Sequence, residues 1–316
     1  MKPIFEIKPI GERINQEYSG GIDLFNVGTM KIKQKFPEGD PIVIDDFAVP
    51  YKTQRYFHSV IQGLADFLIL KKNYPEGKLI IFESGGIWNQ SIDSYSTNPN
   101  IDKDLLDIFK DSAIYIPKNK EVVLNRCAIS GNYHSIFSGL WMGAMSFESD
   151  LYRVQLLKED LLPLLPIKRT EKKKYFISRS QTKGNRSTTE EKLYNKTDML
   201  FEKLGFTVIN FEEMGLVEQI EAMVNASVVV GFQGSNMLNT IFCDQNTNVF
   251  LIKLKNSGYF WWDMIIAQGG ARTFNVLVNA ENGFVDFIKQ LYEHSEIYVM
   301  YVPKSAIDIA QELENS

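Results

Sequence analysis

Residues 227–242, SVVVGFQGSNMLNTIF, place glycines and small polar side chains directly after a continuous apolar run. Such a run is typical of a strand inside a parallel sheet. Gly231 ends the strand, Gly234 allows a close backbone approach, and a helix is expected to begin near Ser235 or Asn236. The free N–H groups of a helix start favour an anion such as phosphate. An ordinary strand-to-helix turn capped by Ser235 or Asn236 explains the same pattern equally well.

A second stretch with residues suited to anion binding is 177–186, ISRSQTKGNR. Arg179 and Arg186 flank a glycine-containing loop that follows a short apolar strand. A guanidinium group matches a phosphate group with two parallel hydrogen bonds. The two arginines are therefore candidates for holding a diphosphate, and two solvated surface arginines are the alternative.

The candidates for acid–base chemistry lie on a helix expected over residues 53–70. At helical spacing His58 and Asp66 share one polar stripe with Arg55 and Gln62. Either His58 or Asp66 could accept a proton from a hydroxyl group. A plain solvated helix face is the alternative. The further candidate bases are Asp45, Asp46, Glu83 and His134.

Strands and helices alternate in the half of the chain that carries both anion-binding stretches. Strands are expected at 174–178, 206–211, 227–232 and 248–254, with helices at 188–204, 216–225 and 236–243. This alternation predicts an α/β fold with a parallel, doubly wound sheet. The first half has a less regular α/β pattern, with strands at 41–46, 78–83 and 121–128 and helices at 53–70 and 101–110.

A proline-containing and basic stretch, residues 161–174 (LLPLLPIKRTEKKK), indicates a boundary between two domains. We expect domains over residues 1–165 and 166–316. A helix expected at 305–313 could pack back on the first domain. The basic residues within 168–174 are expected to form a solvated linker, with contact to acidic lipids as the alternative.

Composition limits the classes of function. The 316 residues carry a net charge of -5, which does not favour nucleic acid as a partner. Cys127 and Cys243 are expected to be reduced thiols, and three histidines leave almost no ligand set for a metal such as zinc. No run of about 20 apolar residues and no signal-peptide pattern is present, so we expect a cytoplasmic location, with peripheral membrane association as an option.

Several motifs in order resemble the C-terminal core of glycosyltransferase family 61. They are the SR–x6–R loop from Arg179, the GF–VIxFEEM strand, the Glu218–Gln219 pair, and VVVGF–QGSNMLN–xIF up to Phe242. Residues 56–70, YFHSVIQGLADFLIL, match the family more weakly. The resemblance implies a GT-B fold, with two Rossmann-like domains facing each other across a cleft. It also implies inverting transfer without a metal ion, from a nucleotide-sugar donor to a glycan or lipid-linked acceptor of capsular polysaccharide or lipopolysaccharide.

The resemblance also implies where the site lies. UDP is the expected nucleotide, no further cofactor is expected, and the base is His58 or Asp66. Gln233 stands where the family usually has His; it can form hydrogen bonds but carries no charge. The donor-binding candidates are Arg179, Arg186, Glu218, Gln233, Gly234, Ser235, Asn236 and Asn239.

Two departures and one alternative chemistry stay open. Ser235 stands for the family's usual Ala, and the strand at 248–254 lacks the acidic residue expected near the ribose of the donor. The missing His at position 233 and the missing acid favour, as one alternative, a catalytically degenerate member that binds a glycan or a nucleotide. Polysaccharide pyruvyl transfer is the other enzyme class considered. The aromatic residues 259–262 (YFWW) are expected to pack between domains or to form a stacking platform.

Overall fold

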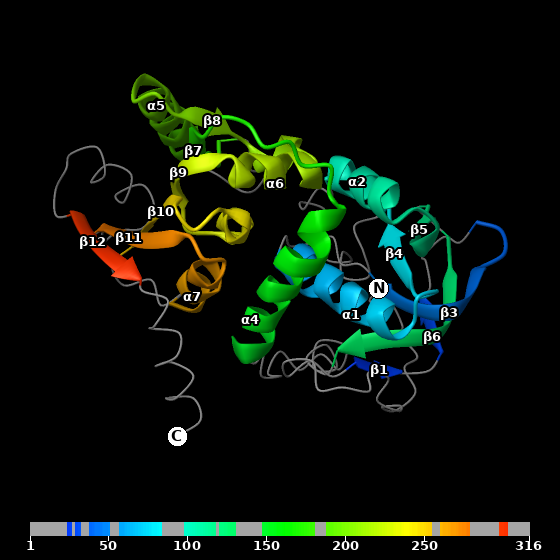
Figure 1. Ribbon diagram of the computed structural model, residues 1–316. Helices are drawn as coiled ribbons and strands as arrows, with labels where there is room; N and C mark the ends of the chain where they lie inside the picture. Colours follow the sequence, from blue (N-terminus) through cyan, green and yellow to red (C-terminus); the bar gives the residue numbers. More distant parts are fainter. Residues whose placement is uncertain are drawn as a thin grey trace. The chain divides into compact units, whose positions relative to one another are not determined.

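The computed structural model describes residues 24–26, 29–32, 38–50, 57–83, 98–117, 120–130, 147–180, 188–254, 260–278 and 297–302. The chain divides into two compact units, Met1–Leu164 and Leu165–Ser316. Each unit contains one six-stranded sheet with its own helices (Figure 1). The helix expected at 305–313 lies outside the described residues.

The sheet of the first unit has a central set of four parallel strands. These are β3 (Ile42–Pro50), β4 (Lys78–Phe82), β5 (Ala113–Ile116) and β6 (Val122–Ser130), arranged in the order β6-β3-β4-β5. The chain therefore runs outward from β3 through β4 to β5 and returns to the other side of β3. Two short strands, β1 (Leu24–Asn26) and β2 (Met30–Ile32), pair antiparallel with β6.

The helices of the first unit cover this sheet with apolar side chains. The single helix expected at 53–70 is a π-helix, η1 (Phe57–Leu64), followed directly by α1 (Ala65–Asn73). π-Helical turns are rare and frequently occur at functional sites. Six consecutive residues of α1, from Ala65 to Leu70, are buried. The remaining helices are α2 (Pro99–Phe109), η2 (Lys110–Ser112), α4 (Phe147–Leu156), η3 (Leu157–Leu161) and η4 (Leu162–Leu164).

The sheet of the second unit confirms the predicted parallel strands and adds two that were not predicted, β11 and β12. Its strands are β7 (Lys173–Ile177), β8 (Thr207–Ile209), β9 (Ala226–Phe232), β10 (Asn248–Leu254), β11 (Arg272–Val278) and β12 (Ile297–Val302). Their order is β12-β11-β10-β9-β7-β8, and only β12 is antiparallel to its neighbour among these strands. This is a Rossmann-like α/β sheet whose strand order reverses between β7 and β9; this place is called the switch point below.

Helices connect the strands of the second unit. They are α5 (Thr188–Lys203), η5 (Phe211–Glu213), α6 (Leu216–Val224), η6 (Ser235–Phe242) and α7 (Phe260–Gln268). The helix expected at 236–243 is the 3₁₀-helix η6, which begins at Ser235. Phe176, Phe232 and Ile252 form one core cluster, in which Phe176 stacks on Phe201 with ring centroids 4.0 Å apart.

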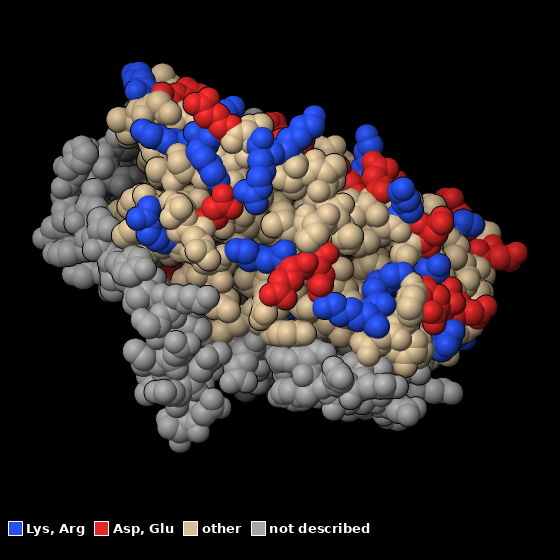
Figure 2. Space-filling view, viewed as in Figure 1, with Lys and Arg blue, Asp and Glu red and all other residues tan. Residues whose placement is uncertain are grey.

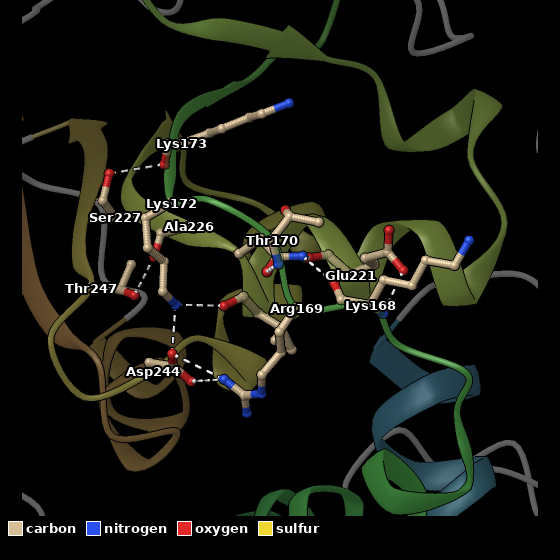
Figure 3. A network of polar contacts seen from close by, with 12 residues as sticks. Lys168, Arg169, Thr170, Lys172, Lys173, Glu221, Ala226, Ser227, Asp244 and Thr247 are labelled. Carbon is tan, nitrogen blue, oxygen red and sulfur yellow. Dashed lines mark hydrogen bonds and ion pairs between the residues drawn. The ribbon is translucent and has the colours of Figure 1, made fainter.

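The basic stretch before β7 is fastened to the amino ends of the strands (Figure 3). The side chain of Asn225 accepts a hydrogen bond from the Thr170 backbone N–H (2.8 Å) and donates one to the Lys168 carbonyl (2.7 Å). Lys172 donates to Asp244 (2.5 Å) and to the Val224 carbonyl (2.7 Å). Figure 2 shows that basic and acidic side chains are interspersed on the face it presents. None of the described helices combines the length and the apolar character needed to cross a membrane.

Candidate functional site

The switch point brings together the two stretches that the sequence marks for anion binding. Ile177, the last residue of β7, pairs with Gly231 near the end of β9. Arg179 follows β7 by two residues, and Gln233 and Gly234 follow β9. In open α/β sheets ligands bind at the carboxyl ends of the strands, where the strand order reverses. The fold therefore places Arg179 and the Gly234 turn where a ligand is expected.

Arg179 and Gly234 lie against each other. A Cβ atom built on Gly234 would lie 3.5 Å from the NH1 atom of Arg179 and 3.0 Å from the Oδ1 atom of Asn236. The backbone of Gly234 is extended, so no unusual dihedral angle requires a glycine here. A side chain here would be tight against Asn236 Oδ1 and in ordinary van der Waals contact with the guanidinium group. Arg179 is only partly buried, so an anion can still reach it.

The start of η6 adds hydrogen-bond donors to this turn. The backbone N–H of Met237 donates to the Gly234 carbonyl (3.0 Å) and to Asn236 Oδ1 (3.1 Å). Asn236 Nδ2 is buried and has no hydrogen-bond partner among the described residues. A buried donor is normally satisfied by a partner, which here would be water or a ligand. Ser235 is the first residue of η6 and is partly exposed.

Two of the predicted donor-binding residues are engaged within the protein. Glu218 accepts a hydrogen bond from the backbone N–H of Gly215 (3.1 Å) and so caps α6. Asn239 is fully buried and donates to Gln219 (2.8 Å). Gln219, also buried, donates in turn to two backbone carbonyls between β8 and α6. These contacts fix η6 against α6 behind the turn; direct contact of Glu218 and Asn239 with a donor stays a prediction.

A buried polar cluster that sequence reasoning missed adjoins Gln233. Asp263 of α7, fully buried, accepts hydrogen bonds from Lys253, from Asn275 (2.8 Å) and from Gln233 (3.4 Å). Burial raises the pKa of Asp263, against the lowering effect of these three donors. Two signals in the sequence could have pointed to this cluster: Lys253 lies near the end of an apolar strand, and Asp263 lies in a helix that begins with aromatic residues. Although no carboxylate lies in β10 or directly after it, α7 brings one beside the end of that strand.

Of the two main candidate bases in the first unit, Asp66 is buried, and the side chain of His58 lies outside the described residues. Asp66 is 1% exposed, and its Oδ1 atom accepts hydrogen bonds from Arg153 Nε (3.2 Å) and NH2 (3.1 Å). Arg153 also donates to Asp150 (2.9 Å), so the three charged groups bind α1 to α4. Asp66 is therefore a buried anchor between helices, and its role as a base stays a prediction. His58 belongs to η1, and its side chain lies outside the described residues.

The other candidate bases belong to β3, follow β4 or lie outside the described residues. Asp45 accepts a hydrogen bond from Asn125 (2.6 Å), and Asp46 lies 3.9 Å from the ammonium group of Lys78. Glu83 is exposed directly after β4. Arg186, His134, Tyr259 and the side chains of Trp261 and Trp262 lie outside the described residues.

Comparison with protein families agrees with the motifs at the switch point. The family model Glycosyltransferase 61 matches residues 56–250, more than half of the chain. The match runs from η1 into β10 and includes Arg179 and the Gly234 turn. No curated protein matches the chain. A family match of this extent identifies the chain as a glycosyltransferase, and the chain belongs to glycosyltransferase family 61.

Proposed function

We propose that the chain transfers a sugar, with inversion, from a nucleotide-sugar donor to a glycan or lipid-linked acceptor. The expected nucleotide is UDP, and the expected setting is the synthesis of a surface polysaccharide such as a capsule or a lipopolysaccharide. The observation that carries the proposal is the contact between Arg179 and the Gly234 turn at the switch point. Membership of the family supports sugar transfer, and this contact supports a diphosphate as the leaving group.

In this proposal the diphosphate lies between the guanidinium groups of Arg179 and Arg186 and the N–H groups at the start of η6. The acceptor oxygen attacks the anomeric carbon as the bond from that carbon to the diphosphate oxygen breaks. The diphosphate leaves with the bonding electrons, and the fixed positive groups stabilise the charge that develops on it. Gln233 and Asn236 supply uncharged hydrogen bonds. This arrangement needs no metal ion.

The acceptor hydroxyl must lose its proton to a base during the same step. We propose His58 for this role in preference to Asp66, because the carboxylate of Asp66 is held by Arg153 in the interior. The first unit then binds the acceptor and the second binds the donor, as the two halves of a GT-B enzyme. We further propose a cytoplasmic enzyme, with peripheral association at the inner face of the membrane as an option.

The binding of nucleotides tests the proposal directly. Purified protein would be titrated with UDP, GDP, CMP, uridine and phosphoenolpyruvate, with and without EDTA. We expect one nucleoside diphosphate to bind regardless of EDTA, and Arg179→Ala to weaken it by about 10- to 100-fold through loss of charge-assisted hydrogen bonds. Arg169→Ala is the matched control, because Arg169 is exposed and pairs with Asp244 at the amino ends of the strands. A wild-type protein that binds no nucleotide would contradict the proposal.

A further inference from the structure

The turn that carries Arg179 is tied to a carboxylate from a helix. Ser178, the residue before Arg179, is fully buried, and its hydroxyl group donates to Asp198 Oδ2 (2.8 Å). The same hydroxyl oxygen accepts the backbone N–H of Ser180, the residue after Arg179, at 3.0 Å. Asp198 lies on α5, twenty residues further along the chain. Both neighbours of Arg179 are thus held by one oxygen atom that Asp198 fixes.

We propose that Asp198 is a positioning residue that holds the Ser178–Ser180 turn so that the guanidinium group of Arg179 meets the diphosphate of the donor. This inference rests on the proposed function. It adds a residue outside the motifs by which the site was found. Asp198 itself touches neither the donor nor the reacting atoms, and it acts through its hydrogen bonds with Ser178 and Ser180.

The number of available protons fixes which group donates the hydrogen bond between Ser178 and Asp198. A serine hydroxyl has one proton and two lone pairs, and an ionised carboxylate can only accept. The proton of Ser178 therefore goes to Asp198, and a lone pair of the same oxygen accepts the backbone N–H of Ser180, whose hydroxyl oxygen lies 3.0 Å away. Without the carboxylate, the Ser178 hydroxyl can rotate and donate elsewhere. The residue between the two serines then loses its defined orientation.

The surroundings of Asp198 are those expected of a residue that positions its neighbours. Burial raises the pKa of Asp198, and the hydrogen bonds from Ser178 and Ser180 act in the opposite direction. Its second oxygen, Oδ1, is buried and has no hydrogen-bond partner among the described residues. A buried unsatisfied oxygen costs stability. The oxygen of Asp198 that does accept a hydrogen bond is the one that faces the turn.

Binding of UDP and of uridine to a set of variants separates positioning from general stability. We expect Asp198→Ala and Ser178→Ala each to weaken UDP about tenfold and to leave uridine unchanged, because uridine has no phosphate for Arg179 to hold. Asp198→Asn keeps an acceptor oxygen for Ser178 and should stay within about threefold of the wild type. Lys203→Gln is the control, because it removes an exposed charge from the same helix.

A double-mutant cycle supplies the decisive readout. If Asp198 acts through Arg179, Asp198→Ala should change UDP binding by less than about twofold in a protein that already carries Arg179→Ala. Equal losses with and without Arg179, or UDP binding by both Asp198→Ala and Ser178→Ala that equals the wild type, would overturn the positioning role while leaving the proposed function intact. A wild-type protein that binds no nucleoside diphosphate would overturn both.

Discussion

In each of the two turns at the switch point, one residue forms a hydrogen bond with a carboxylate from a helix that follows later in the chain. Asp198 of α5 holds the turn after β7 through Ser178, and Asp263 of α7 contacts Gln233 after β9. Both carboxylates have pKa values raised by burial, and both receive hydrogen bonds that favour the ionised form. Polar groups aimed at a ligand need such support, because a side chain that is free to rotate loses orientation and affinity.

Replacing Gln233 with the residue usual in the family should make donor binding depend on pH. In Gln233→His the imidazole would face Asp263 and the bound diphosphate, so its pKa should rise above the ordinary value of about 6.5. The protonated form adds a charge-assisted contact. Affinity for UDP should therefore be about 5- to 10-fold higher at low pH and fall as the pH rises through the pKa of the imidazole.

The measurement is UDP affinity of Gln233→His between about pH 5.5 and pH 8.5, divided by that of the wild type because the terminal phosphate of UDP titrates near pH 6. Gln245→His, which changes an exposed residue in the loop before β10, is the control. A ratio that does not change with pH would show that residue 233 does not face the diphosphate.

Arg179 and Gly234 could be found from the sequence, whereas Asp198 and Asp263 could not. A short apolar strand predicts where its own carboxyl end lies, and an α/β fold predicts that this end faces a ligand. A carboxylate on a helix has no such local signal, because its burial depends on which helix face meets the sheet. Asp66 shows the same limit, since helical spacing placed it on a polar stripe and the structure buries it against Arg153.

At the scale of elements, α7 and η6 approach each other closely through Gly269. A Cβ atom on Gly269 would lie 2.4 Å from the Ile241 Cα atom and 2.7 Å from its carbonyl oxygen. These are backbone atoms, so they cannot move aside as the end of a side chain can. We expect Gly269→Ala to lower the free energy of unfolding by about 1–3 kcal/mol or more. Because η6 begins at the Gly234 turn, UDP binding should weaken as well.

Unfolding in urea and UDP titration of Gly269→Ala test this contact. Gly205→Ala is the useful comparison, because Gly205 has open space around its Cβ position but a φ of +80°. It should cost about 1–2 kcal/mol through backbone strain alone and leave UDP affinity unchanged. Equal effects of the two substitutions on UDP affinity would rule out the proposed link between α7 packing and the turn.

The segment before β7 is held in place by Asn225 at the end of α6. Asn225 is 3% exposed and forms hydrogen bonds with Thr170, Lys168 and Glu221. Asn225→Ala leaves backbone groups of this segment without their partner. We expect a loss of about 2–3 kcal/mol in the free energy of unfolding, measured in urea. Asn246→Ala, an exposed asparagine, should have little effect, and a similarly small effect of Asn225→Ala would contradict the prediction.

Prediction of elements succeeded where one local pattern decides the outcome. The strand β10 has the predicted bounds because its apolar run is bordered by polar turns. The strands β5 and β11 were missed, since β5 is short and partly exposed and β11 has polar residues that the fold buries. The division of the helix at 53–70 into η1 and α1 depends on packing that no single-helix pattern reports.

At the scale of the whole molecule, each unit reverses its strand order once, between β3 and β6 in the first and between β7 and β9 in the second. Alternating strands and helices predicted parallel sheets. The strand order could not be predicted from the sequence, because it depends on the side of the first strand to which each crossover connection leads. The reversal in the first unit lies beside β3, and η1, the helix that carries His58, is the next described element along the chain. This placement is compatible with His58 as the base, and the pH dependence of transfer by His58→Gln would test it.

The stability of the first unit should depend on pH through Asp102, in the first turn of α2. Asp102 is 7% exposed, and burial raises its pKa from 3.8 to about 6. Between these values the folded protein keeps a proton that the unfolded chain has released. The free energy of unfolding therefore falls as the pH rises from about 4 to about 6, by at most about 3 kcal/mol. Asp102→Asn, which is neutral throughout, should remove this loss and be the more stable protein at pH 7.

Unfolding in urea at several pH values, with the exposed Asp107→Asn of the same helix as control, measures the difference. A constant difference between Asp102→Asn and the wild type from pH 4 to pH 7 would mean that Asp102 is as well solvated in the folded protein as in the unfolded chain.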